Sequence, residues 1–288
     1  MITRLFAASR LVKLAKVSIA YAILLVGAVA TVFPLLWTVS TSLKTIDKVT
    51  AVRLELIPDP VAWWNYVEVF QIAPVARQFR NTMFIVIAVV LGSVITSSFV
   101  AYGFARIEFP GRDLLFTLLL STMMMPGVVT LIPRFVIFDW LGWMNTFWPL
   151  VIPQPLGHNP FYIFLMRQFF RGIPQELSDA ARMDGCSEFG IWWRIVMPLS
   201  GPVLAVVAIF SFQWSWNDFL YPLIYLGGKQ ELWTLALGLN AFRAMERQKQ
   251  PLHYLMAMSV LMTIPMLVVF AIGQKQFVRG VVFSGLKG

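Results

Sequence analysis

Residues 174–202 read PQELSDAARMDGCSEFGIWWRIVMPLSGP and form a long polar interruption between apolar stretches, with a pattern that is more than a turn. Pro174 suits the first turn of a helix, and Glu176 favours the positive N-terminal end of that helix. Gly185 stands where a helix commonly ends in a left-handed conformation, and Ser187 can then cap a second short helix. The stretch therefore predicts a compact projection made of a helix, a turn and a second helix.

The composition around this stretch is that of a membrane protein. Of the 288 residues, 58% are hydrophobic and only 13% are charged, with a mean hydropathy of +0.73; average globular proteins are about 25% charged. The net charge of +9 could suggest a nucleic-acid partner, but the basic residues are scattered at the ends of apolar segments. That distribution is typical of membrane-surface anchors, so we expect contact with lipid and not with nucleic acid. The single cysteine, Cys186, excludes an intrachain disulfide and a cysteine-based metal cluster.

Six apolar stretches are long enough to cross a bilayer, because a helix needs about 20 apolar residues to span the hydrocarbon core. The predicted spans are residues 18–43, 82–105, 113–133, 147–169, 201–226 and 254–274. The predicted fold class is therefore an all-α membrane protein with six transmembrane helices. We expect residues 1–17 to be a cytoplasmic N-terminal segment and residues 18–288 to form a single transmembrane domain.

The first seventeen residues predict the orientation of the chain. They carry four basic residues and no acidic residue: Arg4, Arg10, Lys13 and Lys16. Because positive charge favours the cytoplasmic side, the N-terminus is predicted to be cytoplasmic, and six spans then place the C-terminus there too. Residues 174–202 would also face the cytoplasm, where ATP is. Residues 227–253 would lie outside, and a connection of that length is often functional.

Polar side chains at membrane depth form a second candidate site. An unpaired polar group in lipid is costly, so such groups usually face a cavity or another helix. The candidates for a substrate path are Gln154, His158, Asn159, Gln213, Trp214 and Asn217. Amides beside an indole ring suit a neutral polyhydroxylated ligand, because amides donate and accept hydrogen bonds and an aromatic face can cover the apolar side of a sugar ring. The alternative is that these amides bond across helices and hold the bundle together.

Prolines predict that two of the spans are not straight. Pro153, Pro155 and Pro160 surround the polar residues of the fourth span, and this density predicts a kinked or broken helix. Three methionines followed by Pro126 form a soft, kinked stretch in the third span. Asp218, near the outer end of the fifth span, is expected to cap a helix or to pair with a basic residue, since an unpaired carboxylate in the membrane is costly.

The spacing within residues 174–198 resembles the EAA loop of the permease subunits of ATP-binding-cassette (ABC) importers. Three residues separate the EAA positions from the glycine, and nine separate the glycine from the isoleucine that precedes the LP position. The matching residues are Asp179, Ala180, Ala181, Gly185, Ile195 and Pro198. Asp179 replaces the glutamate of the pattern and Met197 replaces the leucine, and both substitutions keep the charge or the apolar character. We call residues 174–198 the EAA loop.

Further segments resemble the carbohydrate branch of these permeases, of the maltose-permease type. They are TSLKT after the first span, RNTMF at the start of the second, FLMRQFFRGIPQEL, SFQWSWNDFLYPL and the C-terminal QKQFVRGVVFSGLKG. The resemblance covers nearly the whole chain. It implies the type I importer permease fold with cytoplasmic coupling helices, and specifically the six-span partner of a heterodimer.

The resemblance also implies the partners and the role of the EAA loop. The chain would sit in a bacterial or archaeal inner membrane with a second, homologous permease, two ABC ATPase subunits and an extracytoplasmic solute-binding protein. It would bind no cofactor, because ATP and Mg would be used by the ATPases, and the solute would be a sugar or oligosaccharide. The EAA helix would enter a cleft of the ATPase, with small residues allowing close approach and charged residues giving complementarity. The implied coupling residues are Glu176, Asp179, Ala180, Ala181, Arg182, Asp184, Gly185, Ile195 and Pro198.

Two other functions are weighed against the importer. An ion-coupled carrier or channel normally carries intramembrane acids or basic relays, and the predicted spans contain little besides Asp218 near one end. A membrane enzyme would need a catalytic constellation, and the two histidines, His158 and His253, fall in different elements. The chain also has no Walker A glycine-lysine loop, so the energy must come from a partner.

Overall fold

The computed structural model describes residues 2–50, 55–154, 156, 159–246 and 252–285. Those residues form helices and connecting loops, and none of them is in a β-strand. The chain divides into two compact units. The first comprises residues up to Ala73 together with Phe242–Leu261, and the second comprises Pro74–Ala241 together with the residues from Met262 onward. The predicted all-helical fold class is confirmed for the described part of the chain.

The first unit begins with α1 (Ile2–Ser42), followed by α2 (Ile46–Thr50) and α3 (Asn65–Ile72). The side-chain amide of Asn65 donates to the carbonyls of Ser42 and Lys44 at 2.8 and 2.9 Å, which ties α3 to the end of α1. Most of α1 from residue 14 to residue 36 is exposed, although its side chains are apolar nearly all round. A helix with that composition is suited to lipid or to another apolar helix.

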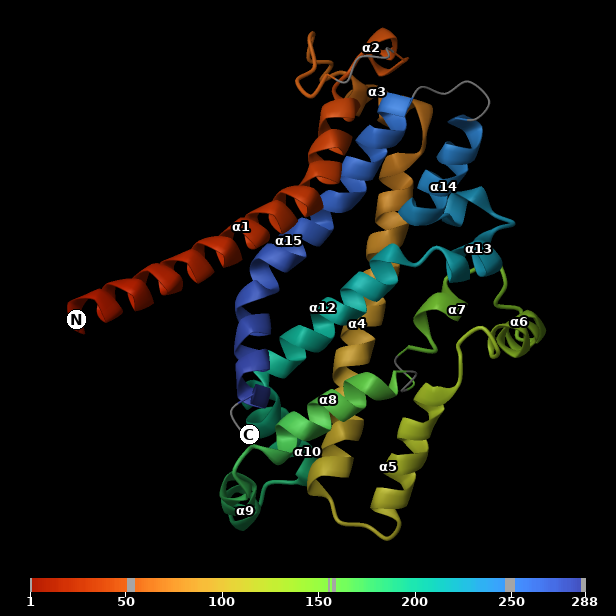
Figure 1. Ribbon diagram of the computed structural model, residues 1–288. Helices are drawn as coiled ribbons and strands as arrows, with labels where there is room; N and C mark the ends of the chain where they lie inside the picture. The colour runs from red at the N-terminus through yellow and green to blue at the C-terminus, as the bar shows by residue number, and fades with distance from the viewer. Residues whose placement is uncertain (1, 51–54, 155, 157–158, 247–251, 286–288) are drawn as a thin grey trace. The chain divides into compact units, whose positions relative to one another are not determined.

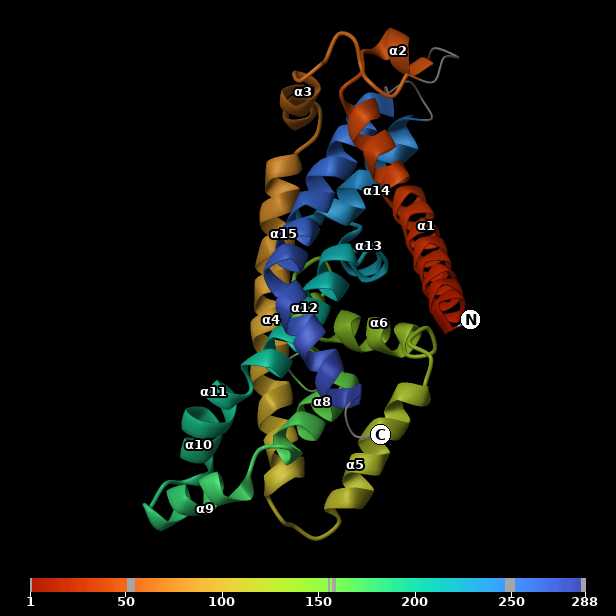
Figure 2. The same ribbon diagram turned by 60° about the vertical axis from the view of Figure 1, so that its left-hand side comes forward.

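The second unit is built on α4 (Val75–Arg106), which packs against α8 (Pro160–Arg171) and α12 (Gly201–Asn217). Figures 1 and 2 both show α8 and α12 lying across α4. The core between these helices includes the fully buried side chains of Tyr102, Ile163, Met166, Phe170 and Val207. This packing leaves one face of α8 and α12 free to line a cavity.

The remaining helices of the described chain are shorter, apart from the last. They are α5 (Arg112–Ser121), η1 (Thr122–Met124), α6 (Leu131–Trp140), α7 (Trp148–Val151), α9 (Gln175–Met183), α10 (Glu188–Ile191), η2 (Trp192–Val196), α11 (Met197–Leu199), α13 (Leu220–Leu226), η3 (Gln230–Leu232), α14 (Leu235–Glu246) and α15 (Leu252–Gly285).

Three predicted spans are not continuous helices. The breaks within residues 113–133 and 147–169 agree with the kinks that the prolines predict, whereas the break within residues 201–226 corrects the expectation of a continuous span. Residues 113–133 break around Pro126 between η1 and α6, and residues 147–169 break between α7 and α8. Residues 201–226 break at Asp218, whose carboxylate accepts from the backbone N–H of Tyr221 at 3.3 Å and so caps α13. Proline removes a backbone donor, and a capping carboxylate offers a backbone N–H an alternative acceptor, so both favour an interrupted helix.

In the described residues, three helices are long and apolar enough to cross a membrane alone: Leu14–Ser42, Val75–Arg106 and Leu252–Gln274. They match the first, second and sixth predicted spans. Glu188–Leu199 and Gly201–Asn217 meet at an 83° bend and pass the same test only as a pair. The count of six spans stays a prediction.

Candidate functional site

The turn of the EAA loop is fixed by backbone hydrogen bonds at the end of α9. The N–H of Gly185 donates to the carbonyl of Arg182 at 3.0 Å, and the N–H of Cys186 donates to the carbonyl of Ala181 at 2.9 Å. Gly185 has φ +79°, so these bonds form a Schellman motif with glycine in the left-handed position. The predicted end of the first helix is therefore confirmed.

The second helix of the loop also begins as predicted. The hydroxyl of Ser187 accepts from the N–H of Gly190 at 3.2 Å and caps α10. The helix then widens into the π-turns of η2, where the N–H of Met197 donates to the carbonyl of Trp192. Pro198 lies within α11, and the chain turns two residues later at Ser200. A wider turn before Pro198 accommodates a residue that cannot donate and whose ring crowds the preceding carbonyl.

Arg182 links the two helices of the loop. Its Nε donates to Glu188 Oε1 and one terminal nitrogen donates to Asp179 Oδ1, both at 2.7 Å. The Tyr102 hydroxyl of α4 donates to the other oxygen of Glu188 at 2.5 Å. The hydrogen bond to Glu188 raises the pKa of Arg182 above its ordinary value. Arg182 and Asp179, predicted to meet a partner, therefore already make contacts within the loop.

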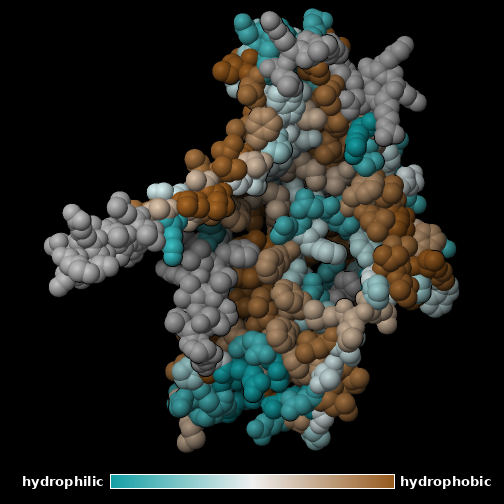
Figure 3. Space-filling view, viewed as in Figure 1, coloured by the Kyte–Doolittle hydropathy of each residue, from teal (hydrophilic) through white to brown (hydrophobic). Residues whose placement is uncertain are grey.

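The predicted coupling residues divide by exposure. The resemblance implied that Ala181 allows close approach of a partner, but its side chain is buried in the hydrophobic core that the loop shares with α4, α8 and α12. Arg182 and Ile195 are half-buried. The others are exposed: Glu176, Asp179, Ala180, Asp184, Gly185 and Pro198. In Figure 3 hydrophilic surface gathers over α9 and the nearby ends of α4 and α5.

Exposed apolar side chains on the loop were missed by the sequence reasoning. Met183, at the end of α9, is 88% exposed, and Leu177 lies exposed on the same helix. Phe189 and Trp193 are exposed on the second helix. Apolar side chains flanked by charges are typical of a protein contact surface. The signal was present, because Met183 is an apolar residue two positions before the turn glycine, but its exposure follows only from the fold of the loop.

Four of the predicted path residues line one open cavity of about 870 Å³ in the second unit. Asn159 caps α8, where its side chain accepts from the N–H of Phe161, while Gln213, Trp214 and Asn217 lie on one face of α12. Cavities of about 300–1,000 Å³ are typical of small-molecule sites. Figure 3 shows the surface hollowed beside α12. Four residues that the sequence predicted to line a substrate path are therefore neighbours in space.

The cavity wall also contains aromatic residues that the sequence reasoning did not select: Phe161, Tyr162, Phe210 and Tyr221. Phe210, Gln213, Trp214 and Asn217 follow the i, i+3, i+4, i+7 spacing of one helix face, so helical periodicity could have found Phe210. Asp218 is the carboxylate of the wall, and it is held by its capping bond to Tyr221. Amides and aromatic faces dominate this surface.

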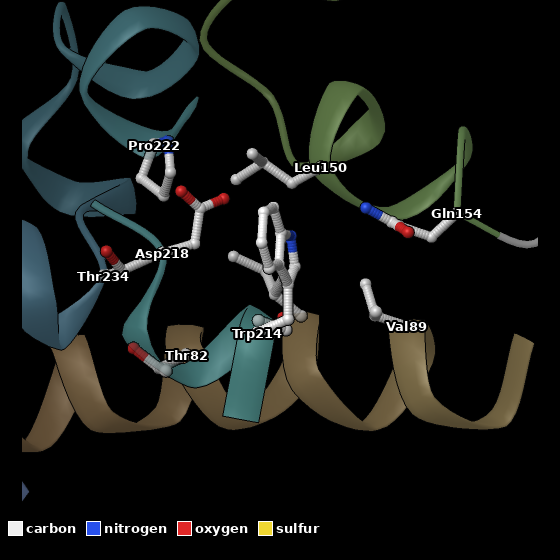
Figure 4. Close-up of a pocket in the computed structure, with 10 residues that line it drawn as sticks. Thr82, Val89, Leu150, Gln154, Trp214, Asp218, Pro222 and Thr234 are labelled. Carbon is white, nitrogen blue, oxygen red and sulfur yellow. The ribbon is translucent and has the colours of Figure 1, made fainter. Parts of the chain in front are cut away.

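The other predicted path residues lie elsewhere. Gln154 lines a neighbouring cavity of about 20 Å³, with Trp214 between it and Asp218 (Figure 4). That space is about enough for a single water molecule. His158 lies outside the described residues. Trp216, which neighbours the predicted set, points away from the large cavity, since it is buried and donates to the carbonyl of Met262 at 3.0 Å.

Comparison with known proteins decides the family. The sequence profile described as "Binding-protein-dependent transport system inner membrane component" matches residues 93–283. The chain belongs to this family. It is therefore an inner-membrane permease subunit of an ABC importer and not an enzyme, as the sequence predicted. In this family ATP is used by partner ATPases, and a solute-binding protein delivers the solute.

Curated relatives cover most of this permease. It is 32% identical over 262 residues to "Probable ABC transporter permease protein YurM" of Bacillus subtilis, covering 90% of this chain and 85% of the relative. It is 34% identical over 260 residues to "Arabinooligosaccharides transport system permease protein AraQ" of Halalkalibacterium halodurans, covering 89% and 91%.

A solved structure has the same fold. It is the crystal structure of a bacterial ABC transporter involved in the import of the acidic polysaccharide alginate, and one of its chains superposes with a TM-score of 0.77 at 24% identity. The match covers 90% of this permease and 95% of that chain. The fold of an ABC importer permease is therefore shown, while the sequence family supports the importer over the ion-coupled carrier or channel.

Proposed function

We propose that this permease forms half of a heterodimeric path for a neutral sugar or oligosaccharide. The observation that carries the proposal is the cavity in which Asn159, Gln213, Trp214 and Asn217 meet. Amides offer both donors and acceptors to hydroxyl groups, and indole and phenol rings offer flat apolar faces. Relatives whose names specify arabinooligosaccharides and diacetylchitobiose support the same class of solute.

The assembly consists of this chain, a second homologous permease, two ABC ATPases and a solute-binding protein. Six spans place both termini and the EAA loop in the cytoplasm, and residues 227–253 outside. The exposed Met183, with Glu176, Asp184 and Gly185, supplies the surface that enters the ATPase. The bonds of Arg182 to Asp179 and Glu188 keep that surface rigid, so movement of the ATPase is passed to the permease.

Orientation is tested with a single reporter on the EAA loop. Met183→Cys in a Cys186→Ser background, in membranes that hold the permease without its ATPases, places an accessible thiol at a site that is 88% exposed in this chain. A membrane-impermeant maleimide is expected to label it in inverted vesicles and not in intact spheroplasts. Trp140→Cys on α6, at an 85% exposed site, serves as the matched reporter in the same background. Labelling of the Met183 site from outside would refute the cytoplasmic loop.

The solute class is tested with the whole complex. The tagged permease is purified from its native membrane, the copurified proteins are identified, and the solute released from the associated binding protein is analysed by mass spectrometry. The expected result is ATPase subunits and a neutral saccharide. Recovery of an amino acid, a metal ion or an acidic saccharide would refute the proposed solute, and absence of an ATPase would refute the proposed coupling.

A further inference from the structure

Helix α4 holds a different element at each of its ends. It runs unbroken from Val75 to Arg106, 32 residues, which is about 48 Å at 1.5 Å per residue. Both Figure 1 and Figure 2 show it as the long rod of the second unit, with α9 and α10 near one end and α14 near the other. The contacts at the two ends are made by buried polar side chains.

At the inner end, Arg106 fixes the start of the EAA loop. Its guanidinium donates to the carbonyl of Phe170 at 2.6 Å and to that of Ile173 at 2.5 Å, and it also donates to the side chain of Gln175. The last carbonyls of a helix have no partner within it, so this arginine ties the end of α8 and the start of α9 to α4. One turn earlier, Tyr102 donates to Glu188 of α10.

At the outer end, Asn81 and Thr82 fix the start of α14. The amide of Asn81 donates to the carbonyls of Glu231 and Trp233 at 2.8 and 3.2 Å. The hydroxyl of Thr82 accepts from the N–H of Leu235 at 2.8 Å. Asn81, Thr82 and Leu235 are all buried, so breaking these bonds would leave polar groups unpaired away from water.

The backbone of α14 also packs directly on α4. A Cβ atom at Gly238 would lie 2.1 Å from the side-chain oxygen of Gln78, so only a glycine fits with Gln78 in its present position. Gln78 is itself buried. The segment from residue 230 to residue 238, which we call the outer segment, is therefore held to α4 by hydrogen bonds and by close packing.

We propose that α4 transmits displacement between the EAA loop and the outer segment, with Tyr102 and Arg106 as positioning residues at one end and Asn81 and Thr82 at the other. The anchors Asn81 and Arg106 are 25 residues apart in one helix, about 38 Å. A continuous helix changes length very little, and coupling over such distances is carried by rigid elements and buried hydrogen bonds. When the ATPase moves the EAA loop, the outer segment moves with α4.

The coupling works in both directions. Energetic coupling between two sites is reciprocal, so a partner that displaces the outer segment alters the affinity of the EAA loop for its own partner by the same factor. The outer segment belongs to residues 227–253, which we expect to face the solute-binding protein. A loaded binding protein would thus act on the ATPases through α4. This inference rests on the proposed docking of the EAA loop to an ATPase.

The test measures movement of the outer segment in the whole complex. Nitroxide labels are placed at Asn240→Cys, an exposed site on α14, and at Trp140→Cys on α6, in a Cys186→Ser background. The complex is reconstituted in nanodiscs, and the distance between the labels is measured in the resting state and after trapping with Mg-ATP and vanadate. In the parent complex, trapping is expected to shift the distance.

The decisive variant is Asn81→Ala with Thr82→Val. It is expected to lose the shift while ATPase subunits still copurify and hydrolyse ATP. The matched control is Thr96→Val, because the Thr96 hydroxyl donates to the Gly92 carbonyl within α4 and joins no other element. The control is expected to keep the full shift. Arg106→Gln, at the other end, is expected to lose the shift as well.

The outcomes separate this inference from the proposed function. An undiminished shift in the Asn81 and Thr82 variant would overturn the role of α4, and so would a parent complex with bound ATPases that shows no shift. A shift lost equally in the Thr96 control would also overturn it, because the loss would then not depend on the anchors. If no ATPase copurified with the parent chain, the docking of the EAA loop would instead be refuted.

Discussion

Substitutions at Gly185 distinguish contact with a partner from the conformation of the turn. Gly185 has φ +79°, and a Cβ atom built there meets no atom within 4 Å. A Cβ atom at this position therefore meets none of the described residues, and we expect the main cost of a substitution to be the strain of the left-handed backbone. That strain is about 1–2 kcal/mol for alanine. Asparagine tolerates the left-handed conformation better, so it costs less although its side chain is larger.

Thermal stability and solute uptake should therefore decrease in different orders among these variants. Thermal stability of the purified complex is expected to decrease from Gly185 to Gly185→Asn to Gly185→Ala. If the exposed turn closely approaches an ATPase, solute uptake and ATPase copurification should instead decrease from Gly185 to Gly185→Ala to Gly185→Asn, because the larger side chain separates the surfaces more. Insertion into the membrane should be unchanged in both variants, as measured by immunoblotting of washed membranes.

A second glycine supplies the control for backbone strain. Gly142, in the loop after α6, has φ +68° and also has no atom within 4 Å of a built Cβ. Gly142→Asn and Gly142→Ala should reproduce the stability order without reducing uptake below what that stability change explains. If uptake in the Gly185 variants followed their stability, with alanine worse than asparagine, close contact at the turn would be refuted. Gly185 would then have only a conformational role.

Three further predictions follow from the contacts of the second unit. Replacing Arg182 and Glu188 singly and together by alanine should give a coupling energy of about 0.5–1 kcal/mol in thermal unfolding, since the pair is only half-buried; additive effects would show that the pair does not stiffen the loop. Trp214→Ala should lower solute uptake at least tenfold while the ATPases stay bound, and Trp214→Phe should recover part of it, because a ring face is restored; equal loss in both would argue against stacking. Gly238→Ala should destabilise the complex by about 1–3 kcal/mol through overpacking against Gln78, and Gln78→Ala should relieve the loss; a neutral Gly238→Ala would contradict the tight packing.

The EAA loop shows how far local sequence can determine structure. The start of α9 after Pro174, the left-handed Gly185 and the cap at Ser187 were all predictable. Each depends on groups within about four residues along the chain, since capping bonds are short-range. The first, second and sixth apolar stretches were equally predictable, because hydropathy over about 20 residues is also a local property. The sequence thus determined the helical class, the loop and the family resemblance.

The tertiary structure decided which side chains meet. Tyr102 and Glu188 are 86 positions apart, and Asn81 and Glu231 are 150 apart, so no local pattern could pair them. The burial of Ala181, the exposure of Met183 and the grouping of Asn159 with the α12 residues likewise follow from how helices pack. The interruption at Asp218 depends on a local bond to the N–H of Tyr221, three residues along the chain, but it was not predicted because a capping carboxylate and a paired one look alike in sequence. Local hydrogen bonding sets where helices begin and end, whereas burial and cavities depend on residues that only the folded chain brings together.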